Sequence, residues 1–245
     1  MTTPDTPLTI LFLSCKRIPY LLRTLEAVRH HFSKVEPQIH PRLICFDNGS
    51  SQAERNHLLG LGFDLLLLAQ ENRGIGPAMN ALVSCVRTPF FLNLQDDWEM
   101  RNPKQLPLVH LAIELLDRDQ RFAHLKVEDY HFLDFTDRNV YDGPFTDTVS
   151  GIPYCVQNPQ MLWGGFSFPP AVTRTSAIHA LGPFREDQPF RRGWAESEFT
   201  QRYAQRYLAI KSPELMLFHH IGDEACPDWT SAPPSPVSHA HRAFA

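Results

Sequence analysis

Three acidic side chains follow an apolar run in the stretch FFLNLQDDWEM, residues 90–100. Residues 90–94 have the composition of a buried strand, and Asp96, Asp97 and Glu99 stand just beyond its end. Two adjacent carboxylates at such a place cost free energy unless a positive charge lies against them. Carboxylate oxygens suit Mg²⁺ and Mn²⁺, so the stretch predicts a divalent metal site. The alternative is a turn or helix start, because a single carboxylate can cap a helix.

Two more polar clusters end apolar runs in the same way. SCKR (residues 14–17) follows the run 8–13, and DNGS (residues 47–50) follows the run 43–46. Ligands of α/β proteins bind beyond the carboxyl ends of parallel strands. We therefore expect these two clusters and QDDW (residues 95–98) to converge on one site.

The elements that must position these clusters are short strands alternating with helices. The expected strands are 8–13, 43–46, 63–69 and 90–94, and the expected helices between them are 21–31, 51–59 and 76–86. Apolar runs of this length between helical patterns are typical of a parallel sheet covered on both faces. The sequence therefore predicts an α/β fold with a mainly parallel, twisted sheet.

The second half of the chain is less regular. We expect helices at 104–118, 173–181 and 194–207 and a last strand at 215–219, and we assign no element to 122–160. Residues 227–245 are rich in Pro, Ser and Ala, which predicts a flexible tail. We therefore divide one domain into a first half, 1–103, and a second half, 104–226.

Composition excludes several classes of protein. The 245 residues carry a net charge of −4, whereas a nucleic-acid binder would normally be basic, so no nucleic-acid partner is expected. Five cysteines without a C-x-x-C pair predict free thiols in a reducing compartment. We find no secretory signal and no apolar run near the roughly 20 residues of a membrane span. We expect a cytoplasmic protein without a transmembrane segment.

Two familiar motifs are incomplete in this sequence. Gly74-Ile75-Gly76 lies between a strand and a helix, but Met79 occupies the third glycine position of a dinucleotide fingerprint. Gly165-Phe166-Ser167-Phe168-Pro169 lacks the last glycine of a nucleophile elbow. A nicotinamide site and a serine hydrolase are therefore both disfavoured.

Two further sets of residues could do chemistry. His219 and His220 end the last expected strand, where they are either ligands or ordinary core and loop histidines. Glu196 and Glu198 begin a helical pattern, where acidic residues also favour the helix dipole. Trp194 beside them makes this helix face partly apolar.

In their order, these pieces resemble glycosyltransferases of the GT-A fold, in particular glycosyltransferase family 2. The matching segments are SCKR (14–17), DNGS (47–50), NRG (72–74) with Ala78 and Asn80, QDD (95–97), WGG (163–165), WAESEF (194–199) with Arg202, and HIG (220–222). Each motif alone is weak, and the resemblance rests on seven motifs in the right order over roughly residues 8–222.

The resemblance implies that 1–103 is a nucleotide-sugar-binding half, that 104–226 is an acceptor-binding and catalytic half, and that the first half contains a donor site. Its nucleotide contacts would be Ser14, Arg17, Asp47, Asn48, Asn72, Gly74, Asn80, Gln95 and Asp96. Asp97 and His220 would hold Mn²⁺ or Mg²⁺. The first acid of the family's triplet is replaced here by Gln95, which puts a carboxylate contact to the ribose in doubt.

The resemblance also implies an acceptor side. Its acceptor contacts would be Trp163, Gly164, Gly165 and Trp194. Glu196 matches the catalytic base, although Ala195 replaces part of the usual acidic pair and Glu198 stays an alternative. The implied activity is metal-dependent transfer of a sugar from a nucleotide-diphosphate sugar, with UDP favoured, to the hydroxyl of an unidentified acceptor, with inversion.

Two other classes stay open. A catalytically inactive nucleotide- or glycan-binding relative is compatible with the changes at Gln95 and Ala195. A sugar-phosphate nucleotidyltransferase would have a similar sheet, but it normally has a glycine-rich, basic loop after the first strand. Residues 14–20, SCKRIPY, contain no glycine, which counts against that class.

Overall fold

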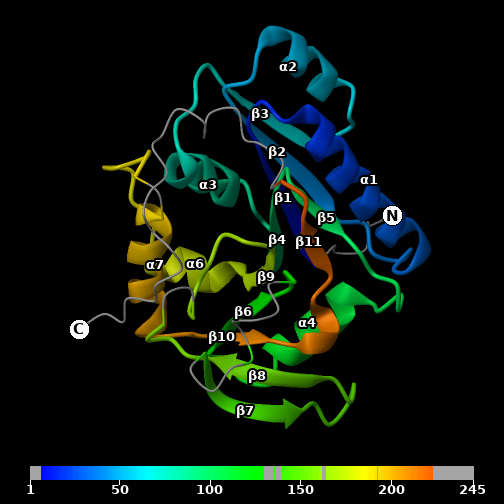
Figure 1. Cartoon of the computed structure of the whole chain (residues 1–245), viewed down its shortest axis with the longest axis vertical. Coiled ribbons are helices and arrows are strands. Elements are labelled where there is room, and N and C mark those ends of the chain that lie inside the picture. Colours follow the sequence, from blue (N-terminus) through cyan, green and yellow to red (C-terminus); the bar gives the residue numbers. More distant parts are fainter. Residues whose placement is uncertain (1–6, 130–134, 136–138, 162–163, 192, 223–245) are drawn as a thin grey trace.

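The computed structural model describes residues 7–129, 135, 139–161, 164–191 and 193–222. A sheet whose described part has nine strands crosses the whole molecule in the order β3-β2-β1-β4-β9-β6-β10-β8-β7 (Figure 1). A second sheet pairs β11 with β5. The expected flexible tail at 227–245 lies outside the described residues.

The first half of the large sheet is parallel, as the sequence predicts. Its strands are β1 (Leu8–Ser14), β2 (Arg42–Asn48), β3 (Leu65–Ala69) and β4 (Phe90–Gln95). β1 lies between β2 and β4, and β3 lies beside β2. The three pairs β1–β2, β1–β4 and β2–β3 all run parallel. The carboxyl ends of β1, β2 and β4 therefore meet at one edge, where the three polar clusters begin.

The second half extends this sheet with strands that the sequence did not reveal. These are β6 (Phe122–Lys126), β7 (Val140–Thr146), β8 (Pro153–Gln157), β9 (Ala171–Arg174) and β10 (Leu208–Lys211). β9 runs antiparallel to both β4 and β6, and β6 pairs in parallel with β10. β4, β6 and β10 therefore point the same way, and their carboxyl ends share the edge of the site.

Helices cover both faces of the large sheet, as expected. α1 (Ile18–Lys34), α2 (Gln52–Leu59) and α4 (Leu108–Leu116) cover one face, and α3 (Ile75–Ser84), α6 (Thr175–Leu181) and α7 (Trp194–Ala204) cover the other. Alternation along β1 divides the core: Ile10 and Phe12 pack toward α1, and Leu11 packs toward α3. No helix in the described part of the chain is long and apolar enough to cross a membrane.

Local sequence explains where these helices begin. Pro19 stands in the first turn of α1, where its missing amide hydrogen costs nothing. Ser51 and Glu54 form a capping box at the start of α2: the Ser51 hydroxyl accepts from the Glu54 amide, and the Glu54 carboxylate accepts from the Ser51 amide. α1 and α2 follow SCKR and DNGS directly, so these caps also fix the clusters.

Several boundaries differ from the sequence prediction. The segment 173–181 was expected to be helical throughout, but residues 171–174 form β9 and the helix begins at Thr175. The strand expected at 215–219 begins only at Phe218, after the 3₁₀ turn Pro213–Leu215. A strand that is buried between two neighbours has no polar alternation, so periodicity does not separate it from a buried helix turn.

The short sheet brings the last described residues to the edge of the large sheet where the polar clusters begin. β5 (Trp98–Met100) continues the chain after β4 and pairs antiparallel with β11 (Phe218–His220). His220 lies opposite Trp98 in this pairing, and their rings are 4.9 Å apart between centroids. The pairing carries His220 to the carboxylates that end β4.

Candidate active site

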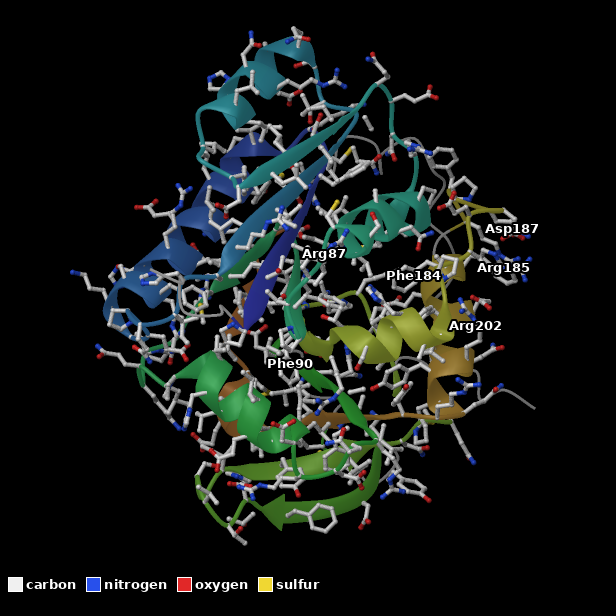
Figure 2. All side chains as sticks on the ribbon, turned by 180° about the vertical axis from the view of Figure 1, so that it is seen from behind. Arg87, Phe90, Phe184, Arg185, Asp187 and Arg202 are labelled. Carbon is white, nitrogen blue, oxygen red and sulfur yellow. The ribbon has the colours of Figure 1, made fainter. Side chains whose placement is uncertain are left out.

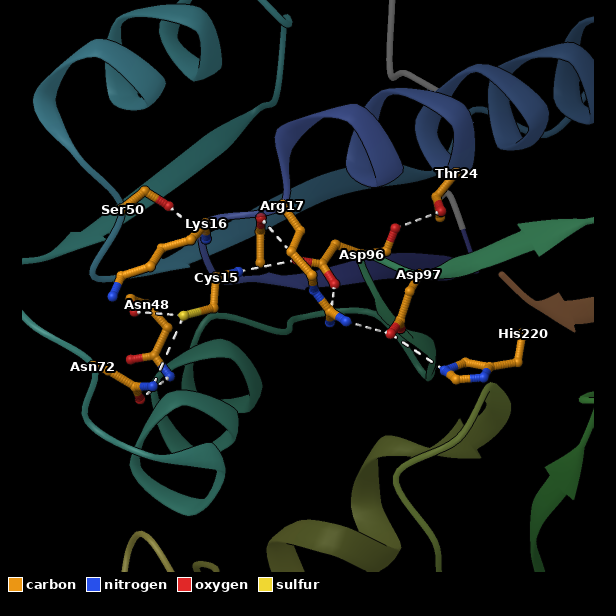
Figure 3. Close-up of polar contacts among 11 residues, drawn as sticks. Cys15, Lys16, Arg17, Thr24, Asn48, Ser50, Asn72, Asp96, Asp97 and His220 are labelled. Carbon is orange, nitrogen blue, oxygen red and sulfur yellow. Dashed lines mark hydrogen bonds and ion pairs between the residues drawn. The ribbon is translucent and has the colours of Figure 1, made fainter. Parts of the chain in front are cut away.

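Arg17 lies against both carboxylates that follow β4 (Figure 3). Its Nη1 is 2.6 Å from Oδ2 of Asp97, and its Nη2 forms an ion pair with Oδ1 of Asp96. His220 Nε2 is 3.3 Å from the same Asp97 oxygen. The chain therefore supplies a cation of its own to the two acids, and the metal ion expected beside them stays a prediction.

Asp96 is fully buried and is held from β1 and α1. Its Oδ2 accepts hydrogen bonds from the Cys15 amide at 3.0 Å and the Ser14 hydroxyl at 3.3 Å. The Thr24 hydroxyl donates to its main-chain carbonyl at 2.8 Å. Burial raises the pKa of Asp96 to about 6: the charge of Arg17 opposes this rise and that of Asp97 adds to it. The carboxyl of Asp96 is thus a structural anchor of the SCKR turn.

Asp97 faces a different environment. Burial alone would raise its pKa, but the hydrogen bond from His220 and the charge of Arg17 outweigh burial and lower the pKa. The amide of Ile221 donates to its carbonyl at 2.9 Å. Within the described part of the chain, its Oδ1 is buried and has no hydrogen-bond partner.

The orphaned oxygen of Asp97 fits a metal ligand. A buried carboxylate oxygen without a partner is costly, and a hard cation would satisfy it. In the described ranges no group of three or more His, Cys, Asp or Glu side chains forms a complete cation site. Asp97 and His220 therefore supply at most part of a coordination shell, and the rest would come from a ligand that brings oxygens.

Asn48 braces the turn that leads into α3. Its Nδ2 donates to the Asn72 side-chain oxygen at 3.0 Å and to the Gly74 carbonyl at 3.3 Å, and its Oδ1 accepts from the Arg73 amide at 2.8 Å. Gly49 has φ +91°, and a Cβ there would lie 2.5 Å from the Asn72 amide nitrogen. The expected nucleotide contacts Asn48, Asn72 and Gly74 are thus brought together, bonded to one another.

Asp47 is paired inside the protein. Its carboxylate is fully buried and lies 3.1 Å from Nε of Arg55, and the Ser50 amide donates to it at 3.3 Å. Arg55 also bonds the Ala69 carbonyl at the end of β3. Asp47 therefore ties β2, α2 and β3 together beside the site.

Cys15 joins the two groups of residues. Its amide bonds Asp96 and its Sγ lies 3.2 Å from the Asn48 carbonyl oxygen. Lys16 beside it has φ +57°, and its amide donates to the Ser50 hydroxyl at 2.9 Å. This left-handed residue turns the chain from β1 into α1 and so aims Arg17 at the carboxylates (Figure 3). Gln95 ends β4 in register with Leu13 of β1.

Asn80 connects α3 to the second half of the chain. Its side chain donates to the Phe184 carbonyl and accepts from the Phe184 amide, both at 2.8 Å. A Cβ at Gly76 would lie 3.2 Å from the Cβ of Ala195, so α7 also packs closely on the first turn of α3. The N-terminus of α7 is therefore held next to the donor half, with Arg185 and Asp187 at the outer edge of the molecule (Figure 2).

The two candidate bases are placed differently. Glu196 is buried, and its Oε1 accepts a hydrogen bond from the Phe168 amide at 2.6 Å. Both oxygens of Glu198 bond Arg202, at 2.7 and 2.8 Å. The same guanidinium donates to the carbonyls of Leu181 and Pro183. Glu198 is thus committed to a structural network that joins α7 to the end of α6.

The residues expected on the acceptor side are partly packed. The guanidinium carbon of Arg191 lies 4.5 Å from the centroid of the Trp194 ring, and that of Arg185 lies 5.7 Å from it. A Cβ at Gly164 would be 1.7 Å from the Asn158 carbonyl oxygen, and one at Gly165 would be 3.4 Å from the Tyr203 ring. These glycines therefore permit close packing, and Trp163 lies outside the described residues.

No protein-family model and no curated protein matches this sequence. Solved structures do match. The 1–349 fragment of S. aureus TarS in complex with UDP-GlcNAc superposes with a TM-score of 0.63 and 12% identity, over 94% of this chain and 62% of that one. The mannosyltransferase PcManGT from Pyrobaculum calidifontis, in complex with GDP-Man and Mn²⁺, superposes with a TM-score of 0.64 and 14% identity, over 89% of this chain and 57% of that one. The fold is the GT-A glycosyltransferase fold.

At these identities the likeness concerns the GT-A fold itself. The chain spans about three fifths of the length of TarS 1–349 and of PcManGT. The GT-A fold that the sequence resemblance implied is confirmed, and so is the α/β sheet with helices on both faces. The division into halves at residue 103 stays a prediction.

Four of the residues that contact the expected site residues were missed by sequence reasoning. They are Cys15, Thr24, Arg55 and Gly222. Gly222 stood in the HIG motif and could have been singled out from it. Thr24 and Arg55 lie inside helical patterns, where a threonine or an arginine carries no signal of a long-range bond.

Proposed function

We propose that this protein is a metal-dependent glycosyltransferase that moves a sugar from a nucleotide-diphosphate sugar to an acceptor hydroxyl, with inversion. One observation carries the proposal: Asp97, at the carboxyl end of β4, is bonded through one oxygen to Arg17 and His220, and its other oxygen is buried and has no partner among the described residues. This arrangement suits a cation and a diphosphate. PcManGT, which shares the fold, is in complex with GDP-Man and Mn²⁺.

The donor would bind along the carboxyl ends of β1, β2 and β4. Arg17 is the cation best placed for its diphosphate, because a guanidinium forms paired hydrogen bonds with phosphate oxygens. The braced turn at 72–74 and the DNGS cluster would face the nucleoside. UDP is our first choice of nucleotide, since TarS is in complex with UDP-GlcNAc, and GDP is the second choice from PcManGT.

Asp97 and His220 are the residues that would hold Mn²⁺ or Mg²⁺. When bound, the ion would neutralise the negative charge that develops on the departing nucleotide diphosphate. Asp96 would act indirectly, since Cys15, Ser14 and Thr24 hold it in place. Its role would be to position Arg17 and the SCKR turn rather than to touch the donor.

Glu196 is our candidate for the base that removes the acceptor proton. The Glu196 side chain is buried, and the Phe168 amide fixes one of its oxygens, which holds the carboxylate in one orientation. Its backbone neighbour Ala195 packs on α3, so the carboxylate would lie between the donor and acceptor halves. A base on the face opposite the leaving group favours single displacement and hence inversion. The bonds from Glu198 to Arg202 make Glu198 the weaker candidate.

Hydrolysis of the donor in the absence of an acceptor tests this function. The purified protein is incubated with Mn²⁺ and a panel of UDP-, GDP- and dTDP-sugars, and release of the nucleotide is measured. We expect slow release from at least one sugar, and the same reaction should be absent in Glu196→Gln and in Asp97→Asn. Binding of a nucleotide without any release, across the whole panel, would favour the non-catalytic relative.

A further inference from the structure

The carboxylates of Asp96 and Asp97 already have a counter-ion within the chain. Arg17 contacts both Asp96 and Asp97, and these two carboxylates are its side-chain partners within the described part of the chain. The Arg17 side chain is 18% exposed, whereas those of Asp96 and Asp97 are 0% and 5% exposed. One positive charge is therefore closed in with two negative charges at the place where a metal ion is expected.

A divalent ion and Arg17 compete for the same carboxylate. An ion bound to Asp97 would lie close to the guanidinium, and two positive charges at such a separation repel each other strongly when water is excluded. His220 lies beside the same oxygen and leaves little room for displacement on that side. The repulsion is relieved only when Arg17 moves away or when a negative charge joins the site.

We propose that Arg17 is the internal counter-ion of the Asp96–Asp97 pair, that it opposes binding of a divalent ion alone, and that the donor diphosphate draws it away so that ion and nucleotide bind together. This inference rests on the proposed donor site. It makes Arg17 a positioning residue for the metal as well as a contact of the diphosphate. Metal and nucleotide binding are then coupled, and by linkage each raises the affinity of the other.

The surroundings of Arg17 allow such a movement. Arg17 stands at the N-terminal boundary of α1, immediately after the left-handed Lys16, and its side chain makes no capping bond to the helix. Its long stem can therefore turn without disturbing α1. Asp97 is fixed from the other side, because the Ile221 amide bonds its carbonyl and Gly222 packs on its carboxylate. Arg17 is the mobile partner and Asp97 the stationary one.

Binding of Mn²⁺ in the absence of nucleotide tests the inference. The free Mn²⁺ signal in electron paramagnetic resonance is titrated with wild type, Arg17→Met and the control Arg23→Met. Arg23 is also on α1 and pairs with Glu99 at 3.1 Å, so its loss changes the net charge equally. We expect Arg17→Met to bind Mn²⁺ about tenfold or more tightly than wild type, within the usual range of coupling, and Arg23→Met to match wild type.

A second variant controls for the possibility that Arg17→Met does not fold. Loss of Arg17 leaves two buried carboxylates uncompensated, so Arg17→Met/Asp96→Asn removes one negative charge together with the cation. It should show the same gain in Mn²⁺ affinity through Asp97, with the circular dichroism spectrum of wild type. The inference is overturned if both variants bind Mn²⁺ no more tightly than wild type. It is equally overturned if wild type binds Mn²⁺ alone as tightly as it does with UDP present, after correction for the Mn–UDP complex.

These outcomes are independent of the proposed activity. The Mn²⁺ titration uses no sugar donor, so it tests Arg17 even if no nucleotide sugar is hydrolysed. Conversely, donor hydrolysis with unchanged Mn²⁺ affinity in the Arg17 variants would leave the glycosyltransferase proposal standing and remove the counter-ion role. A structural defect alone would weaken metal binding and would not produce the expected gain.

Discussion

Gly222 lies directly against the carboxylate of Asp97: a Cβ at position 222 would be 2.3 Å from Oδ2 and 2.8 Å from Cγ. Because of this contact, a side chain at position 222, two residues after His220, would collide with the Asp97 carboxylate. The main chain of residues 220–222 passes so close to Asp97 that it fixes both the carboxylate and the imidazole beside it.

Gly222→Ala should weaken Mn²⁺-dependent nucleotide binding by about tenfold or more, because the added methyl group displaces the Asp97 carboxylate, and misplacing the support of a metal ligand usually has an effect of that size. Calorimetry with UDP in the presence and absence of Mn²⁺ measures it. Gly60→Ala, at a helix end with room for a Cβ, is the control and should bind like wild type. Unchanged binding in Gly222→Ala would show that this contact does not shape the site.

Glu196→Gln and Glu198→Gln should separate catalysis from stability. Gln at 196 can still accept the Phe168 hydrogen bond, so folding and nucleotide binding should persist while turnover falls on the order of 10²- to 10⁴-fold. Gln at 198 weakens the pair with Arg202, which should cost at most about 1 kcal/mol of stability and leave turnover nearly intact. Steady-state kinetics with thermal denaturation checks both. The opposite pattern would move the base to Glu198.

The stability of the protein should depend on Asp96 in a definite direction. Burial raises the Asp96 pKa from 3.8 to about 6, so between these values the folded state binds more protons than the unfolded state. Stability contributed by this group is therefore present at low pH and is lost as the pH rises through about 6. Asn at this position does not titrate, which gives a reference.

We expect the free energy of unfolding of wild type to fall relative to Asp96→Asn by on the order of 1 kcal/mol between about pH 5 and about pH 8. Urea unfolding of both proteins at the two pH values measures the difference. If the free energy of unfolding of wild type instead rises relative to that of Asp96→Asn as the pH rises, pairing with Arg17 dominates over burial and our assignment of the titration is wrong.

Gly49→Ala should destabilise the fold strongly. Gly49 has φ +91°, and a Cβ would lie 2.5 Å from the Asn72 amide nitrogen, which is main chain and cannot move aside cheaply. Gly151 has φ +72° and open space around a Cβ, so Gly151→Ala carries the conformational penalty alone. Denaturant unfolding should show a loss of about 1–2 kcal/mol for Gly151→Ala and at least about 1 kcal/mol more for Gly49→Ala. Equal losses would mean that the main chain at Asn72 does not pack closely on position 49.

The parallel half of the sheet could be predicted because its strands are short apolar runs with polar residues at their ends. β10 could not be predicted, since it ends on Lys211, which reads as a surface residue. The Lys211 ammonium is in fact fully buried and lies 3.0 Å from Glu128, which is 83 residues away in the sequence. Buried charge pairs of this kind are visible only in three dimensions.

The position of the donor site could also be predicted, because the carboxyl ends of parallel strands must meet. Its internal bonding could not. Arg17 and Asp97 are 80 residues apart, and the sequence shows the need for a positive charge without showing its source. Likewise, the sequence does not show that the Asn80 side chain bonds the main chain of Phe184, 104 residues away. Long-range partners such as these depend on loop paths that local patterns do not encode.

We propose that Asp97 binds the metal ion of a nucleotide-diphosphate donor. Calorimetric titration of wild type and Asp97→Asn with UDP, GDP and dTDP, each with and without Mn²⁺, tests it most directly. We expect wild type to bind one of the three with an affinity that Mn²⁺ increases. Asp97→Asn should keep the folded spectrum and lose that increase. Binding of none of the three nucleotides to wild type, or an increase with Mn²⁺ that survives in Asp97→Asn, would contradict the account.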